Sequence, residues 1–285
     1  GLEVDFVPGD WRHGIDSKTV RKELDADPNG EIKAVLAVHT ETSTGINSGI
    51  SAIREAIDSV LHPALFMVDA VSSLACSDYR HDEWKVDVTV SASQKGLMLP
   101  PGLAFNAVSE KAIEASKNST AKHSYWRWDE MLTNNARGYF PYTPGTNLLY
   151  GLDEALNMLN EEGLDNVIAR HARHAQATRI AVDAWGLENL CLNENEYSNS
   201  TTAVMMPDGF DADELRLKIL ERFNMSLGMG LGKVKGSVFR IGHIGDFNDL
   251  MLAGTLSGVE MGLELTKVPF KKGGVQAALE FLANK

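Results

Sequence analysis

The sequence contains no long apolar run and no excess of basic residues. No stretch approaches the roughly 18 consecutive apolar residues that a membrane-spanning helix needs, so we expect no membrane partner. The chain has 27 basic against 39 acidic residues, a formal net charge of −12. Because nucleic acids and anionic membranes are bound through basic surfaces, this charge argues against either as a partner.

Cysteine is scarce as well. Cys76 and Cys191 are the only two, and their spacing matches neither a metal site nor a redox pair. Cysteines of this kind are typical of small buried side chains in a reducing compartment, which predicts a cytoplasmic protein. His171 and His174 could share one face of a helix, but no third ligand accompanies them, so we predict no metal site.

What the chain does contain is a regular alternation of strand and helix patterns over its first half. Its 285 residues, 44% of them hydrophobic, suffice for a large core. Strands are predicted at residues 2–7, 32–39, 64–69, 86–90 and 102–108, with helices at 17–26 and from residue 50 onward. The continuous apolar run at 32–39 is typical of a strand covered on both faces. This alternation predicts an α/β fold with a mostly parallel sheet.

The pattern changes near residue 146. Two long helices are predicted at 147–164 and 166–187, followed by a strand at 201–207, a helix at 212–223, a strand at 238–241, and helices from residues 248 and 274. We therefore expect a large domain at residues 1–162 and a smaller C-terminal α/β domain at residues 163–285.

Polar residues follow three of the predicted strands where each one ends. They are HTETSTG at 39–45, Asp69, and SASQK at 91–95. Ligands of α/β sheets bind beyond the carboxyl ends of the strands, so these three segments are predicted to converge on a site.

Two of these strand-end residues could be chemically active. Lys95 precedes the apolar loop GLMLPPG, which is too apolar to face solvent. Desolvation lowers the pKa of a lysine and makes its amine nucleophilic, as Schiff-base chemistry requires, although most lysines after strands are merely solvated. Asp69 directly follows an apolar run and is predicted to be desolvated. It could order its loop, or it could pair with a cationic ring nitrogen.

Three further features have two interpretations each. The hydroxyls at residues 42–44 could cap the next helix or bind a ligand. Arg240 lies within a predicted strand, where it could form an internal salt bridge or clamp a substrate carboxylate through two hydrogen bonds. The segment GMGLGKVKG at 228–236 is similar to a phosphate loop, but a valine follows Lys233 where that motif needs Ser or Thr.

Taken in order, HTETSTG, VDAVSS, SASQKGLMLPPG, FPYTPGTNLLYGL and FRIGHIGDFNDL resemble the class V aminotransferases of fold type I. The resemblance covers essentially the whole chain and is greatest to the serine–glyoxylate branch of the family. It implies dependence on pyridoxal 5′-phosphate (PLP) and assembly as a homodimer. By this resemblance the chain lacks the N-terminal segment of typical members, which supplies a glycine-rich turn for the cofactor phosphate and an aromatic residue stacked on the ring.

The resemblance also implies roles for residues that match the family motifs. Lys95 matches the lysine that binds the cofactor covalently, and Asp69 matches the carboxylate that keeps the pyridine nitrogen protonated. Val71 matches the apolar residue packed on the ring, and Thr42 matches the hydroxyl near the phenolic oxygen of the ring.

The remaining matches concern the phosphate and the substrate. Gln94 and, from the partner subunit of a homodimer, Thr143 match phosphate ligands, while Arg240 matches the arginine that binds the substrate carboxylate. The implied reaction transfers the amino group of serine, or of alanine, to glyoxylate, and gives glycine and a 2-oxo acid (hydroxypyruvate from serine). Two alternatives stay open: a cysteine desulfurase-like or other class V PLP enzyme, and a truncated, inactive PLP-fold fragment.

Overall fold

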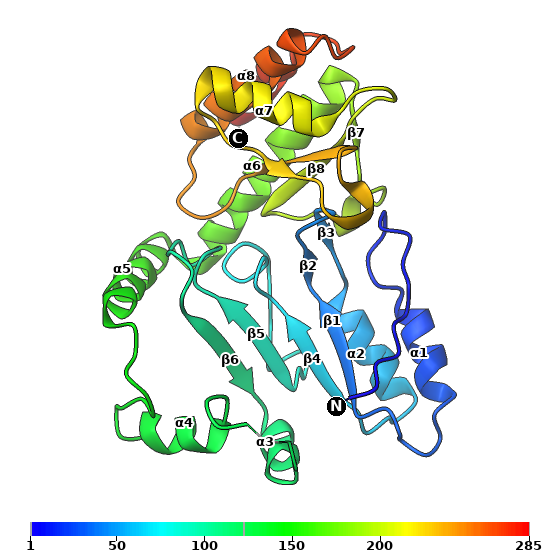
Figure 1. Cartoon of the computed structure of the whole chain (residues 1–285), viewed down its shortest axis with the longest axis vertical. Helices are drawn as coiled ribbons and strands as arrows, with labels where there is room; N and C mark the ends of the chain where they lie inside the picture. The colour runs from blue at the N-terminus through cyan, green and yellow to red at the C-terminus, as the bar shows by residue number, and fades with distance from the viewer. Residues whose placement is uncertain (1, 122, 285) are drawn as a thin grey trace.

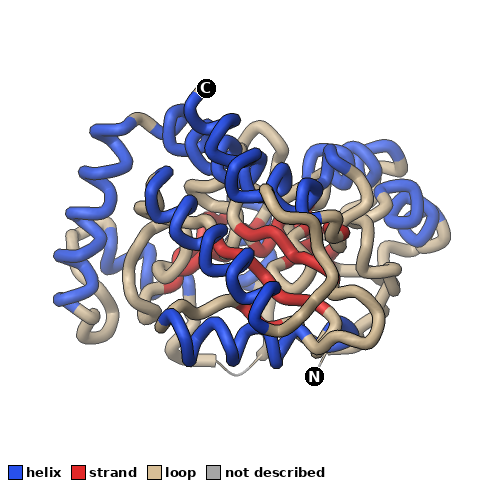
Figure 2. Tube along the Cα trace, turned by 90° about the horizontal axis from the view of Figure 1, so that it is seen from above, coloured by secondary structure: helices blue, strands red, loops and turns tan. Residues whose placement is uncertain are grey.

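The protein consists of two lobes, each built around its own sheet (Figure 1). The structure, a computed structural model, describes residues 2–121 and 123–284. Seen from above, strands lie toward the middle and helices surround them (Figure 2). No helix in these residues is long and apolar enough to cross a membrane.

The first lobe contains a four-stranded sheet in the order β1-β4-β5-β6. Its strands are β1 (Ala34–Val38), β4 (Leu65–Asp69), β5 (Val88–Ala92) and β6 (Ala104–Val108). The first three are parallel to one another and β6 is antiparallel to β5. The α/β fold and the mostly parallel sheet are therefore confirmed.

Helices α1 (Ser17–Asp25) and α2 (Ile50–Ser59) cover one face of this sheet. The Asp16 carboxylate caps α1 by accepting hydrogen bonds from two backbone N–H groups of its first turn. The isoleucines of α2 recur at helical spacing and are almost fully buried against Phe66 and Val68 of β4. The same isoleucines whose spacing predicted the helix therefore form the core between α2 and the sheet.

The opposite face of the sheet is open in the part of the chain that the structure describes. Leu36 of β1 is 75% exposed and Val90 of β5 is 39% exposed. The prediction that the 32–39 strand is covered on both faces is therefore wrong here. The strand predicted at 2–7 is also wrong: its apolar residues are exposed and pair with no sheet.

The remaining elements of the first half frame this sheet. A short hairpin formed by β2 (Thr40–Glu41) and β3 (Ile46–Asn47) follows β1. Three helices follow β6: α3 (Glu110–Lys117), α4 (Trp128–Asn135) and α5 (Thr146–Glu162).

The second lobe contains an antiparallel sheet in the order β7-β8-β10-β9. Its strands are β7 (Glu188–Asn189), β8 (Thr201–Met205), β9 (Gly228–Met229) and β10 (Val238–Gly242). Its helices are α6 (Leu164–Trp185), α7 (Ala212–Phe223), α8 (Asp249–Leu265) and α9 (Gly274–Ala283), with 3-10 turns η1 (Glu194–Glu196) and η2 (Gly232–Val234). This is the smaller C-terminal α/β unit expected from the sequence.

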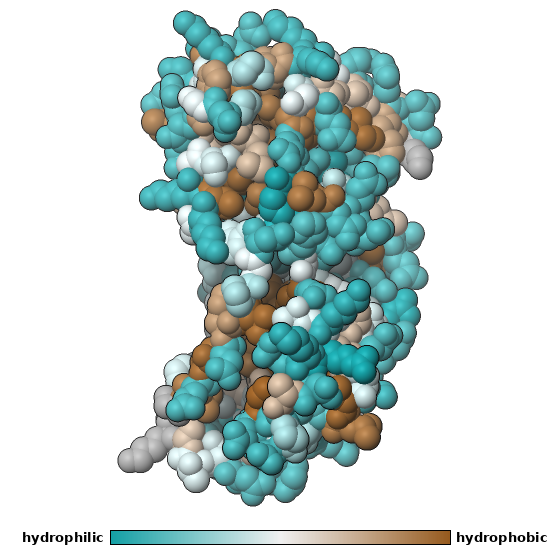
Figure 3. Space-filling view, turned by 90° about the vertical axis from the view of Figure 1, so that its right-hand side faces the viewer, coloured by the Kyte–Doolittle hydropathy of each residue, from teal (hydrophilic) through white to brown (hydrophobic). Residues whose placement is uncertain are grey.

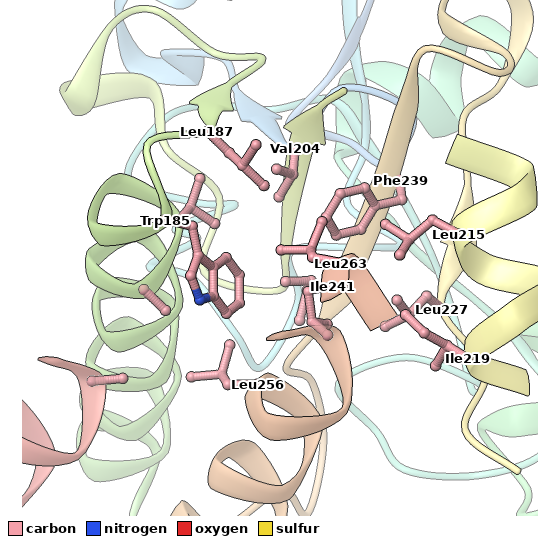
Figure 4. Packing of buried hydrophobic residues seen from close by; sticks show 14 of the residues in the cluster. Trp185, Leu187, Val204, Leu215, Ile219, Leu227, Phe239, Ile241, Leu256 and Leu263 are labelled. Atoms are coloured by element: carbon pink, nitrogen blue, oxygen red, sulfur yellow. The ribbon is translucent and has the colours of Figure 1, made fainter. Parts of the chain in front are cut away.

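The core of the second lobe lies between its sheet and its helices. In Figure 4, Trp185 projects from α6 toward Ile241 of β10 and Leu256 of α8, and all three are fully buried. Burial of each such side chain contributes about 1.5–3 kcal/mol. This core holds β10 in place, and with it the residues that β10 carries toward the first lobe.

Helix α6 joins the two lobes. A single residue, Gly163, separates it from α5, and the φ of Gly163, +83°, suits glycine. Val167, in its first turn, packs with Leu97, Leu99 and Ala155 of the first lobe. A domain boundary between residues 162 and 163 stays a prediction, because the start of α6 belongs to the core of the first lobe.

Candidate active site

A cavity of about 320 Å³ lies between the strand ends of the first lobe and the sheet of the second. It is lined by Thr42, Ser72, Lys95, Ser200, Thr201, Met225, Ser226, Leu227, Gly228, Arg240, Gly242, Ile244, Phe247 and Thr255. In the space-filling view the outline narrows between the lobes (Figure 3). Three of the residues predicted from the sequence, Thr42, Lys95 and Arg240, line this cavity.

Lys95 lies in a turn just after β5 and is half-buried. Its amine makes no hydrogen bond or ion pair with any residue that the structure describes. Burial, followed by the positive charge of Arg240, lowers the pKa of Lys95, while Cys76 and Asp69 act in the opposite direction. A larger fraction of this amine is therefore unprotonated than in a solvated lysine, as nucleophilic chemistry requires.

The loop around Lys95 is folded tightly against the first lobe. Ser93 is fully buried, and its hydroxyl donates to the Pro100 carbonyl at 2.8 Å. A Cβ atom on Gly96 would lie 2.2 Å from the Leu74 carbonyl oxygen and 2.8 Å from Cys76 Sγ. Only glycine allows such an approach, so Gly96 brings the backbone next to Lys95 against the turn that follows β4.

Asp69 ends β4 and is exposed, so the prediction that it is desolvated is wrong for the described residues. Side chains alternate along a strand, and Asp69 shares the open face with Met67 rather than the face of the buried Phe66 and Val68. Its Oδ1 accepts a hydrogen bond from the Val71 backbone N–H at 2.8 Å. Asp69 ends β4 and Lys95 follows the parallel strand β5, so both lie at the carboxyl end of the sheet, where the charge of Asp69 acts on Lys95.

Arg240 connects the two lobes across the cavity. Its Nη1 donates to the Thr42 carbonyl at 2.7 Å and its Nε donates to the Met229 carbonyl at 2.8 Å. The internal salt bridge considered from the sequence does not form with any described carboxylate. Burial, followed by the charge of Arg216, lowers the pKa of Arg240, yet a guanidinium stays charged in proteins. Among the described residues, Arg240 is thus a cation that forms no ion pair, although the negative charge of Glu41 acts to raise its pKa.

The other predicted residues lie outside the cavity lining. Val71 is half-buried, whereas Gln94 and Thr143 are exposed. Thr143 lies in the segment before α5.

Sequence reasoning missed several hydroxyls of the cavity. The Ser72 hydroxyl hydrogen-bonds to Thr42 Oγ1 at 2.6 Å, and Ser200, Thr201 and Ser226 also line the cavity. Ser72 lies in the VDAVSS segment singled out from the sequence, so its position after a strand end could have identified it. Among the described residues, no group of three His, Cys, Asp or Glu could hold a metal ion.

Comparisons with known proteins identify the family. Residues 1–231 match the family described as Aminotransferase class-V. A serine–glyoxylate aminotransferase of Arabidopsis thaliana is 48% identical over 283 residues, which are 99% of this chain and 71% of that protein. The chain belongs to the class V aminotransferases.

Two further relatives agree with this assignment. An L-aspartate–glyoxylate aminotransferase of Paracoccus denitrificans is 44% identical over 98% of this chain and 71% of its own length. The crystal structure of pyridoxamine–pyruvate aminotransferase from Mesorhizobium loti superimposes with a TM-score of 0.89 at 31% identity, covering 96% of this chain and 70% of that one. The enzyme is accordingly a PLP-dependent aminotransferase, and its substrates are an amino acid and a 2-oxo acid.

The residues present fit PLP. PLP binds to enzymes through its aldehyde. Lys95 offers a half-buried amine whose pKa is lowered and which makes no hydrogen bond or ion pair with any described residue. At the same edge Asp69 supplies a carboxylate, and the Thr42–Ser72 pair supplies hydroxyls. An amine, a carboxylate and hydroxyls are the groups that the aldehyde, pyridine nitrogen and phenolic oxygen of this cofactor would use.

Proposed function

We propose that this aminotransferase transfers the amino group of serine to glyoxylate, forming hydroxypyruvate and glycine. The observation that carries the proposal is the lining of the cavity, which combines one guanidinium with six hydroxyl-bearing residues. These are Thr42, Ser72, Ser200, Thr201, Ser226 and Thr255. The names of the relatives in Arabidopsis thaliana and Paracoccus denitrificans support glyoxylate as the acceptor.

The lining favours serine over aspartate and alanine as the donor. Aspartate carries a second carboxylate, but the cations that line the cavity in the described chain are Lys95 and Arg240 alone. Lys95 must stay available to the cofactor, so only Arg240 remains to bind a carboxylate. The hydroxyl of serine can exchange hydrogen bonds with the hydroxyls that line the cavity, and alanine lacks that contact.

In this proposal the residues that match the family motifs have separate tasks. When bound, PLP withdraws electrons from the α-carbon of the donor. Lys95 Nζ anchors the cofactor and then accepts the proton that leaves the donor α-carbon. Asp69 holds the pyridine nitrogen protonated, Val71 contacts the ring, and Thr42 donates to its phenolic oxygen. The apolar loop after Lys95 keeps water from its amine.

Binding of the phosphate requires a second subunit. Gln94 of one subunit and Thr143 of the other bind the phosphate, and the protein is a homodimer. Thr143 is exposed and does not line the cavity of its own chain, which is consistent with this arrangement. A cytosolic location belongs to the same proposal, because both cysteines are buried and unpaired.

The alternative reaction, desulfuration of cysteine, needs a mobile nucleophilic thiol. Burial raises the pKa of the Cys76 thiol to about 12, and Cys191 is also buried with a raised pKa. Neither thiol suits that chemistry, because the thiolate is the nucleophile and both thiols stay protonated near neutral pH.

The test is a donor comparison at fixed glyoxylate. The PLP-loaded enzyme is assayed for glycine formation with serine, alanine and aspartate. Serine should give the highest kcat/KM, and sedimentation should show a dimer. A higher kcat/KM with aspartate would contradict the donor assignment. Absence of glycine with every donor would favour the alternative of a non-catalytic PLP-fold protein.

A further inference from the structure

Gly228 of β9 lies directly opposite Arg240 of β10 in the antiparallel sheet. A Cβ atom on Gly228 would lie 3.0 Å from Arg240 Cβ, 3.2 Å from its Nε and 3.4 Å from its Cζ. Paired residues of antiparallel strands usually keep their Cβ atoms about 4.5–5.5 Å apart. The space that a side chain at residue 228 would fill is therefore occupied by the side chain of Arg240.

This folded-back course of the side chain determines where the guanidinium lies. It brings Nε to the carbonyl of Met229, the residue after Gly228, and Nη1 to the carbonyl of Thr42 in the other lobe. A guanidinium has five N–H donors in a rigid plane, so these two bonds leave three. Arg240 lines the cavity, and the three remaining donors are available there to a carboxylate.

The glycines of the GMGLG segment have separate roles, although the segment was set aside as a phosphate loop. A Cβ atom on Gly230 would lie 2.1 Å from the Val234 carbonyl oxygen, and Gly232 has φ of +53°. Those two glycines are needed by the backbone itself. Gly228 has no such φ, so alanine there would strain no backbone and would meet Arg240 instead.

We propose that Gly228 is a positioning residue for substrate binding. Because Gly228 has no side chain, the side chain of Arg240 can fold across β9 and donate hydrogen bonds to two backbone carbonyls. Its remaining N–H donors then face the carboxylates of both the amino donor and the 2-oxo acid. The proposal rests on the carboxylate-binding role given to Arg240 above. It predicts that a single methyl group at residue 228 weakens the binding of both substrates by displacing the Arg240 side chain.

The first experiment compares Gly228→Ala with the wild-type enzyme, both loaded with PLP. KM for the amino donor and for glyoxylate should each rise about tenfold, because one charge-assisted contact is lost. The absorbance of the bound cofactor should stay the same. Calorimetry with glycolate, a carboxylate that cannot be transaminated, should show affinity weaker by a similar factor. Gly254→Ala is the matched control: Gly254 is exposed on α8, is not one of the residues that line the cavity, and its added methyl would contact no described atom within 4 Å.

A double-mutant cycle tests whether Gly228 acts through Arg240. Once Arg240→Ala has removed the side chain, adding Gly228→Ala should change glycolate affinity less than twofold. If Gly228→Ala alone fails to fold, the double variant should recover folding, because the clash is gone. Unchanged glycolate affinity in Gly228→Ala, an equal loss in the Arg240→Ala background, or a double variant that also fails to fold would each overturn the proposal. Glycolate binding reports on this contact even if serine–glyoxylate activity is absent, so the two proposals can fail separately.

Discussion

Replacement of Glu260 by alanine should destabilise the second lobe by about 2–4 kcal/mol. Glu260 Oε2 accepts hydrogen bonds from the Trp185 indole N–H at 2.6 Å and from the Val275 backbone N–H at 3.1 Å, and Oε1 accepts from Gly273 at 3.4 Å. Because Trp185 is fully buried, loss of its acceptor leaves a buried donor unpaired, at a cost of about 1–3 kcal/mol. Loss of the acceptor for the first turn of α9 adds about 1 kcal/mol.

The pH dependence of this contribution has a definite sign. Burial acts to raise the pKa of Glu260, but the hydrogen bonds from Trp185 and the α9 N-terminus outweigh it, and the pKa is lowered. A carboxylate whose folded-state pKa is lowered adds stability above its unfolded value, about 4.3, and that part is lost as the pH falls through the folded-state pKa. The difference in free energy of unfolding between wild type and Glu260→Gln should therefore be largest near pH 7 and should decrease below about pH 4.

Urea unfolding followed by tryptophan fluorescence measures the effect. Glu264→Ala is the control, because it removes the same charge one turn along α8, where Glu264 forms an exposed pair with Lys272 at 3.0 Å. Such pairs contribute only about 0–1 kcal/mol. If Glu260→Ala destabilised the protein no more than Glu264→Ala, the Trp185–Glu260 bond would not stabilise the lobe and the reasoning would be refuted.

Three further predictions concern the candidate active site. Lys95→Ala should leave no cofactor attached after borohydride reduction, as judged by peptide mass spectrometry, and an adduct on another lysine would contradict the anchor assignment. Asp69→Asn keeps an acceptor for the Val71 N–H but removes the negative charge. We therefore expect kcat to fall by roughly two orders of magnitude while PLP stays bound. Near-normal turnover would show that Asp69 only orders its loop. Arg240→Lys replaces the planar fork with a point charge, so KM for both substrates should rise at least about tenfold in steady-state assays, and unchanged values would require another carboxylate site.

Periodicity was sufficient to predict most elements. Helix α7 begins and ends at the predicted residues, and α2 and α9 begin at the predicted residues. Strand β5 lies two residues later than predicted, at Val88–Ala92, so its last residue is only three before Lys95. These elements agree with the sequence because their apolar residues face one local partner, either a helix or the sheet beneath it.

The N-terminal segment shows why local pattern can fail. Residues 2–7 alternate like a strand, yet Leu2, Val4 and Phe6 are 92%, 81% and 80% exposed. Alternation describes a half-buried strand only where a neighbouring strand supplies hydrogen bonds, and no described strand pairs with this segment. The Arg240–Thr42 contact, between residues 198 positions apart, is equally absent from any local pattern.

Lys95 and Asp69 show when apolar neighbours in the sequence predict the burial of a charged side chain and when they do not. Asp69 follows an apolar run and Lys95 precedes one, and both were expected to be desolvated on that ground. For Lys95 the expectation agrees with the structure, because the residues after it fold back as a loop that buries Leu97 and Leu99. Asp69 is still part of a strand, so the direction of its side chain follows from alternation with the buried Val68, and it lies on the open face. An apolar neighbourhood in sequence therefore predicts desolvation for a loop residue that the chain can cover, whereas for a strand residue the face decides.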